Sequence, residues 1–206
     1  PIAAALNAIK GEQRTLVLRR GWESVLDAQL YGQSVDRDTL RAMQAAMVAS
    51  FTDFRRYLQA KASLLSGGDE RQLAFWDLFA PVGDTRPRSW EEARAAVEDA
   101  FDSYSPQLRA LARRAFERSW IDVAPRKGKQ GGAFCMPMGD GDSRILLNFS
   151  GSVDGVMTLA HELGHAYHNS TMADRTPLQR GTPSSLAETA SIFCETIMVG
   201  HGIANA

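Results

Sequence analysis

The stretch His161-Glu162-Leu163-Gly164-His165 decides how this chain is interpreted. Two histidines four residues apart on a helix present their imidazoles on the same side, so both can reach one zinc ion. The glutamate after the first histidine can then hold and deprotonate a water on that ion. The pattern therefore predicts metal ligands at His161 and His165 and a general base at Glu162. The alternative is a helix that carries two unrelated histidines.

The residues before this stretch predict a strand, a turn and then the helix. Residues 144–149 form a short apolar run, which is typical of a buried strand, and residues 150–152 form a turn. Ser152 or Asp154 can cap the helix that follows. Apolar residues then recur at helical steps, at Val156, Leu159, Leu163, Ala166 and Tyr167. The helix therefore has an apolar side to bury.

A catalytic zinc ion needs a third protein ligand and one open position. Downstream, Thr182 and Pro183 predict the start of a helix that runs to residue 198. Glu188 and Glu195 are seven residues apart on it and share one face. We therefore expect Glu188 to be the third ligand and Glu195 to orient a histidine. The alternatives are a capping box between Ser185 and Glu188, and a solvated face for Glu195.

Two motifs carry a family resemblance. Residues 161–168 (HELGHAYH) and 186–191 (LAETAS) resemble the thimet oligopeptidase family of zinc metallopeptidases, and its oligoendopeptidase F branch fits best. Residues 77–81 and 125–135 also look like that branch, so the resemblance covers nearly the whole chain. It implies one Zn²⁺ per chain, bound by His161, His165 and Glu188. It further implies that short peptides are hydrolysed by a zinc-bound water that Glu162 activates.

The family's domain is much longer than this chain, and its transition-state stabilisers, a histidine and tyrosines, lie well beyond the glutamate ligand. The resemblance therefore implies a central fragment, inactive alone, whose partners are short peptides and the missing remainder of its own catalytic domain. Two other functions stay open. One is a carboxypeptidase-like relative of the same family, and the other is a non-catalytic metal-binding helical module.

Helical periodicity dominates the first two-thirds of the chain. With the resemblance, it predicts an α+β fold: mainly α with a small antiparallel β-sheet, of the zincin-like, neurolysin-type helical architecture. We expect residues 1–124 to form one wall of a peptide channel and residues 125–206 to form a partial zinc-binding catalytic region, both within one larger domain. The apolar positions of the helix at 36–65 are expected in the core; they are Leu40, Met43, Met47, Phe51, Phe54 and Leu58.

Composition excludes several classes of protein. The formal net charge is −1, which gives no sign of a nucleic-acid or anionic-membrane partner. No run of apolar residues is long enough to span a membrane. Cys135 and Cys194 do not suggest a disulfide framework, so we expect free thiols and a cytoplasmic location.

Three further features have less decisive patterns. Residues 126–132 form a basic, glycine-rich loop, either an exposed connector or a mobile rim over a bound peptide. Residues 138–142 lack the ligand register of a calcium loop and predict a hairpin turn between two strands. An edge strand beside the metal would let an extended peptide add as a further strand. His168 lies about 10 Å along the helix from His161, so one ion cannot easily bind both. We therefore expect His168 either to support a metal ligand or to have a structural role.

Overall fold

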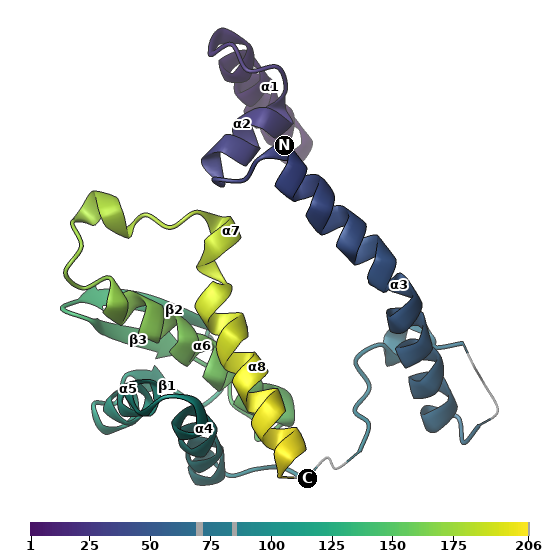
Figure 1. Ribbon diagram of the computed structural model, residues 1–206, viewed down its shortest axis with the longest axis vertical. Coiled ribbons are helices and arrows are strands. Elements are labelled where there is room, and N and C mark those ends of the chain that lie inside the picture. The colour runs from purple at the N-terminus through teal and green to yellow at the C-terminus, as the bar shows by residue number, and fades with distance from the viewer. Residues whose placement is uncertain (69–71, 84–85, 206) are drawn as a thin grey trace. The chain divides into compact units, whose positions relative to one another are not determined.

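The computed structural model describes residues 1–68, 72–83 and 86–205 (Figure 1). Its contacts divide the chain into two compact units, Pro1–Val82 with Pro183–Ser185, and Gly83–Thr182 with Leu186–Ala206. Helices predominate in both units, as the sequence predicts. The functional division expected at residue 124 concerns a larger catalytic domain and stays a prediction.

The first unit is built from three helices, α1 (Ile2–Arg19), α2 (Val25–Gly32) and α3 (Arg37–Leu65), followed by a short 3₁₀ turn, η1 (Phe75–Asp77). Ser24 caps α2 by accepting a hydrogen bond from the backbone N–H of Asp27, and Asp36 caps α3 in the same way. The Nζ of Lys61, a buried side chain, donates to the backbone oxygen of Leu78 at 2.8 Å. This bond ties the end of α3 to the segment that follows it.

The apolar face of α3 is exposed within the first unit, which corrects the expectation that it lies in a core. Met43, Met47, Phe51 and Phe54 are each more than 40% exposed. The periodicity was sufficient to predict the helix, because helical spacing depends only on the local chain. It was not sufficient to predict burial, since no described element of this unit packs against that face.

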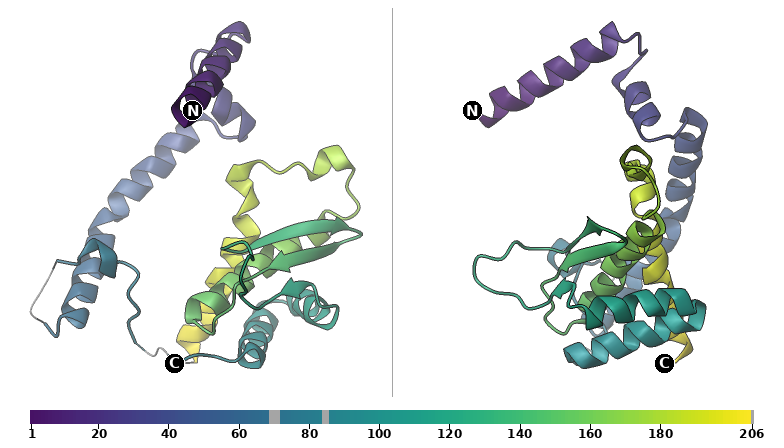
Figure 2. Two further views of the ribbon diagram at one scale, coloured as in Figure 1. Left: turned by 180° about the vertical axis from the view of Figure 1, so that it is seen from behind. Right: turned by 90° about the vertical axis from the view of Figure 1, so that its left-hand side faces the viewer.

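The second unit contains the helical pair α4 (Trp90–Tyr104) and α5 (Pro106–Glu117). The capping box predicted at the start of α4 forms: Ser89 and Glu92 exchange hydrogen bonds with each other's backbone N–H. The longer helices α6 (Val153–Thr171) and α8 (Thr189–Ala204) lie side by side in Figures 1 and 2. Along the chain, α6 is followed by the 3₁₀ turn η2 (Pro177–Arg180) and the short helix α7 (Ser184–Ala187), and then by α8.

A three-stranded sheet, ordered β1-β3-β2, lies beside α6. The strands are β1 (Ile121–Asp122), β2 (Phe134–Gly139) and β3 (Asp142–Leu146). The expected antiparallel pair is β2 with β3, joined by the predicted hairpin turn. The sheet is nevertheless mixed, because β1 pairs with β3 in parallel. With two residues, β1 is too short to leave a periodic signal in the sequence.

The core of the second unit fixes which side of α6 is free. Buried residues on α6 include Val156, Leu159 and Leu163, and they belong to one cluster with residues of α4, α5 and α8 and with Trp120. The apolar stripe predicted for this helix therefore faces the core. His161 and His165 stay partly exposed on α6. Within residues 1–68, 72–83 and 86–205, no helix combines the length and apolar character that a membrane crossing requires.

Candidate metal centre

The three predicted ligands meet at one point. The Nε2 atoms of His161 and His165 are 3.2 Å apart, and Oε2 of Glu188 lies 3.1 Å from the first and 3.3 Å from the second. Bonds of about 2.0–2.1 Å from a tetrahedral ion to three such atoms place those atoms about 3.3–3.4 Å apart. The observed spacing therefore suits a small divalent ion such as Zn²⁺, held by two imidazoles and one carboxylate.

The position of Glu188 corrects one detail of the sequence interpretation. The expected continuous helix from residue 182 to 198 is interrupted, and Glu188 occupies the N-cap position between α7 and α8. The proposed capping box with Ser185 does not form, because the hydroxyl and N–H of Ser185 both bond to Gln33. Because of this break, Glu188 lies at the start of α8 and not within a helix, and its carboxylate reaches the histidines of α6.

Ser191 is a site residue that the sequence interpretation missed. Its fully buried hydroxyl lies 2.8 Å from Oε2 of Glu188 and 2.9 Å from the backbone oxygen of the same residue. The hydrogen bond from Ser191 is the main cause that lowers the pKa of Glu188. Ser191 therefore helps to hold Glu188 in its ionised, ligand-competent form.

Glu195 contacts the other side of His161. Its Oε1 lies 2.5 Å from Nδ1 of His161, which leaves Nε2 directed toward His165 and Glu188. This contact fits the expected orienting role, because an acceptor at Nδ1 fixes the tautomer that exposes a lone pair on Nε2. His168 is not part of this cluster; one turn beyond His165, it lines an apolar cavity with Tyr104, Leu108 and Phe193 among its walls.

Glu162 is buried beside the cluster, with 5% of its surface exposed. No described residue makes a hydrogen bond to its Oε2. Burial raises the pKa of Glu162 to about 7; the charge of His161 opposes this rise and that of Glu188 adds to it. Glu162 lines the adjoining cavity, and a carboxylate whose pKa is raised to about 7 suits the exchange of protons at neutral pH.

Burial also lowers the pKa of His165, and the neighbouring charges of His161 and His168 act in the same direction. The carboxylate of Glu188 acts in the opposite direction. A lowered pKa favours the neutral imidazole, which is the form that donates a lone pair to a metal ion.

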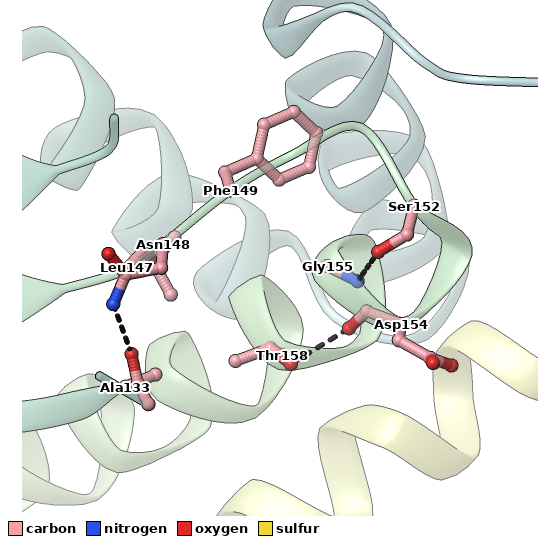
Figure 3. Close-up of a pocket in the computed structure, with 9 residues that line it drawn as sticks. Ala133, Leu147, Asn148, Phe149, Ser152, Asp154, Gly155 and Thr158 are labelled. Atoms are coloured by element: carbon pink, nitrogen blue, oxygen red, sulfur yellow. Dashed lines mark hydrogen bonds between the residues drawn. The ribbon is translucent and has the colours of Figure 1, made fainter. Parts of the chain in front are cut away.

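Two adjoining cavities run along the first half of α6. The one at His161 and Glu162, of about 380 Å³, is lined by Ala133, Asp154, Met157, Thr158, His161, Glu162 and Glu195. The next, of about 390 Å³, shares Ala133, Asp154 and Thr158 with it and extends to Asn148 and Ser152 (Figure 3). Ala133, the residue before β2, therefore borders a groove that leads to Glu162 and His161.

The model of Peptidase family M3 matches residues 3–205, which is nearly the whole chain. The chain belongs to Peptidase family M3. The resemblance inferred from the two sequence motifs is thereby confirmed.

Relatives within the family carry oligopeptidase names. An oligoendopeptidase F homologue of Lactococcus lactis subsp. lactis is 26% identical over 87% of this chain. The group B oligopeptidase PepB of Streptococcus agalactiae is 30% identical over 69% of it. The chain spans 30% of the length of the first relative and 24% of the second.

Solved structures share the fold. A Bacillus anthracis protein proposed to be an oligoendopeptidase F superposes with a TM-score of 0.72 at 16% identity, over 92% of this chain and 36% of that protein. A Chlamydophila abortus protein proposed to be a peptidase superposes with a TM-score of 0.66 at 20% identity, over 99% of this chain and 34% of that one. The mainly helical architecture with a small sheet is therefore that of this group of structures.

Proposed function

We propose that this chain is the metal-binding part of a zinc-dependent oligoendopeptidase that hydrolyses short peptides. The observation that carries the proposal is the triangle of Nε2 of His161, Nε2 of His165 and Oε2 of Glu188, with sides of 3.1–3.3 Å. Family membership and the names of the relatives support peptide bonds as the target. They also favour endopeptidase over carboxypeptidase action.

The residues divide the work between binding and proton transfer. His161, His165 and Glu188 hold Zn²⁺, Glu195 orients His161, and Ser191 orients Glu188. Zinc bound there lowers the pKa of a water ligand and polarises the carbonyl of the scissile bond. The carboxylate of Glu162 would take the proton from the attacking water and then deliver it to the leaving amine. Its burial and lack of a protein partner suit this role.

A bound peptide would lie along β2. This strand pairs only with β3 among the described residues, so its outer edge offers backbone donors and acceptors. The strand begins at the groove that contains Glu162. Backbone pairing of this kind holds a peptide in extended form without requiring a particular side chain.

We also propose that the chain needs further parts of a catalytic domain for efficient turnover. Among the described residues that line the cavity at Glu162, none is a tyrosine, arginine or lysine that could stabilise an oxyanion. The relatives are about three times as long, so the stabilising groups can lie in parts that have no counterpart here.

Two measurements, one on this chain and one on a longer protein that contains it, test the proposal. Elemental analysis after dialysis against zinc is expected to give one ion per chain, and quenched fluorescent peptides of graded length are expected to be cleaved internally by a longer protein that contains this chain. One zinc per chain with no cleavage by the longer protein would support the non-catalytic metal-binding module instead. Release of only terminal residues would support the carboxypeptidase-like alternative.

A further inference from the structure

The loop between β1 and β2 is held from inside by a lysine. The side chain of Lys129 is 1% exposed, and its Nζ donates to the backbone oxygens of Asp122 and Ala124, each at 2.9 Å. Nζ also lies 3.2 Å from Oδ1 of Asp122. Three oxygen atoms thus surround an ammonium group that has three N–H donors. Residues 126–128 and 130–132 are exposed, as expected for an exposed connector, but the enclosed Lys129 side chain ties the loop to the end of β1.

Asn148 holds the same loop nearer to the candidate metal centre. Its Nδ2 donates to the backbone oxygens of Gln130 and Gly132, each at 2.9 Å. Figure 3 shows the Asn148 amide directed at the backbone beside Ala133. Both N–H groups of the amide are thus used to hold Gln130 and Gly132, two residues of the segment that leads into β2.

This part of the loop has intrinsic freedom that the two side chains restrain. Gly131 and Gly132 adjoin each other, and Gly132 adopts a φ of +80° and would have no atom within 4 Å of a Cβ if it carried one. Local sterics therefore do not select its conformation. The hydrogen bonds from Asn148 hold the backbone oxygens of Gln130 and Gly132 instead, and Lys129 ties the residue just before them to the end of β1.

We propose that Asn148 and Lys129 are positioning residues for peptide binding, which hold residues 130–133 so that the edge of β2 is ready to pair with a substrate backbone. The inference rests on the proposed function, because it assumes that peptide lies along β2. A strand edge that is ordered before binding avoids the loss of conformational entropy when the peptide arrives. Neither side chain needs to touch the reacting atoms.

Hydroxamates separate this role from a general effect on folding. Acetohydroxamate is small enough to contact only the metal, whereas a tripeptide hydroxamate would also pair with the edge of β2. Two tripeptides are used, one with the hydroxamate at its amino end and one with it at its carboxyl end, so that both directions along β2 are tested. Dissociation constants are measured by calorimetry on the zinc-loaded 206-residue chain. On the unaltered chain, the better tripeptide is expected to bind at least about tenfold tighter than acetohydroxamate. If it does not, the proposed binding of peptide along β2 is wrong, and this inference falls with it.

If the tripeptide hydroxamate binds more tightly, we expect three variants to lose most of that advantage: Asn148→Ala, Asn148→Asp and Lys129→Met. In each, the affinity for the tripeptide hydroxamate should fall by about tenfold, and the affinity for acetohydroxamate should stay unchanged. Asn148→Asp keeps the size of the side chain but replaces the donating amide by an oxygen. Lys127→Met is the matched control, because Lys127 is exposed in the same loop and has no hydrogen bond or ion pair among the described residues. Unchanged tripeptide affinity in the Asn148 and Lys129 variants would overturn the inference and leave the proposed function intact.

Limited trypsin digestion gives a test that does not depend on how the variants fold. Arg126, Lys127 and Lys129 are three potential cleavage sites in one loop, but only the Lys129 side chain is enclosed. On the unaltered chain, cleavage after Lys129 is expected to be at least about tenfold slower than after Lys127. Equal rates at the two lysines would show that the loop is not held and would overturn the inference.

Discussion

Gly164 of α6 lies directly against Ala190 of α8. A Cβ atom on Gly164 would be 2.6 Å from the backbone oxygen of Ala190 and 2.7 Å from Cα of Ser191, closer than real Cβ atoms approach. The absence of a side chain at this position therefore permits the close approach of the two helices. Because His165 belongs to α6 and Glu188 immediately precedes α8, this approach also sets the spacing of the candidate ligands.

Replacing Gly164 is expected to disturb the metal centre through the backbone. Gly164→Ala should force α8 away from α6, lower the free energy of unfolding by about 1–3 kcal/mol, and reduce the zinc content of the purified chain. Gly200→Ala is the control, since this helical glycine in α8 has no neighbouring atom within 4 Å. The control should raise helix stability by about 0.5–1 kcal/mol and keep its zinc. Full zinc content in Gly164→Ala would refute the packing argument.

Ser191 is expected to support the metal through Glu188. Ser191→Ala removes the hydroxyl that lies 2.8 Å from Oε2 of Glu188, so zinc affinity should fall by about 10–100-fold in competition with a chelating dye. Thr196→Ala removes a hydroxyl of the same helix that bonds only to the backbone oxygen of Ile192, and it should bind zinc normally. Equal affinities of the two variants would assign Ser191 a purely structural role.

The sequence was sufficient to predict that the rings of His161 and His165 lie together, because their spacing is local. His161 and His165 are one helical turn apart on any α-helix, and the apolar stripe of α6 determines which face is buried. The hairpin β2–β3 and the capping box of α4 were likewise predicted from short patterns. In each case, residues within a few positions of one another determine the geometry.

Contacts between distant segments could not be predicted in this way. The break at Glu188, the buried hydroxyl of Ser191 and the pairing of β1 with β3 all depend on how elements pack. Lys129 looks like one more charge in a basic loop, and only the fold reveals that it is enclosed. The exposed face of α3 is the converse case, in which a clear apolar pattern has no partner within its own unit.

Glu162 is expected to be needed for turnover but not for metal binding. Glu162→Gln keeps the shape of the side chain and removes its ability to accept a proton, so kcat of a longer, active protein should fall by about 10²–10⁴-fold. Its zinc content by elemental analysis should match that of the unaltered protein, since Glu162 is not one of the three clustered ligands. An active Glu162→Gln protein would remove the assignment of the base.

The two cysteines report on the core of the second unit. Burial raises the pKa of both Cys135 and Cys194 to about 12, and both thiols are free. The thiolate is the reactive form, so at pH 8 only about 10⁻⁴ of each thiol is reactive, against about a quarter for an ordinary cysteine. The rate of labelling by a thiol reagent should be low in the native chain and should increase about tenfold per pH unit. In urea, which unfolds the chain, labelling should become fast. Fast labelling of two thiols in the native chain at pH 8 would contradict the packing described for β2 and α8.

A crystal structure of the chain with zinc, phased by the anomalous signal at the zinc edge, tests the central claim most directly. It should show one ion at about 2.0–2.1 Å from Nε2 of His161, Nε2 of His165 and a carboxylate oxygen of Glu188, with one position open. An ion bound elsewhere, or one whose coordination is completed by another group while Glu188 points away, would contradict the proposed metal centre.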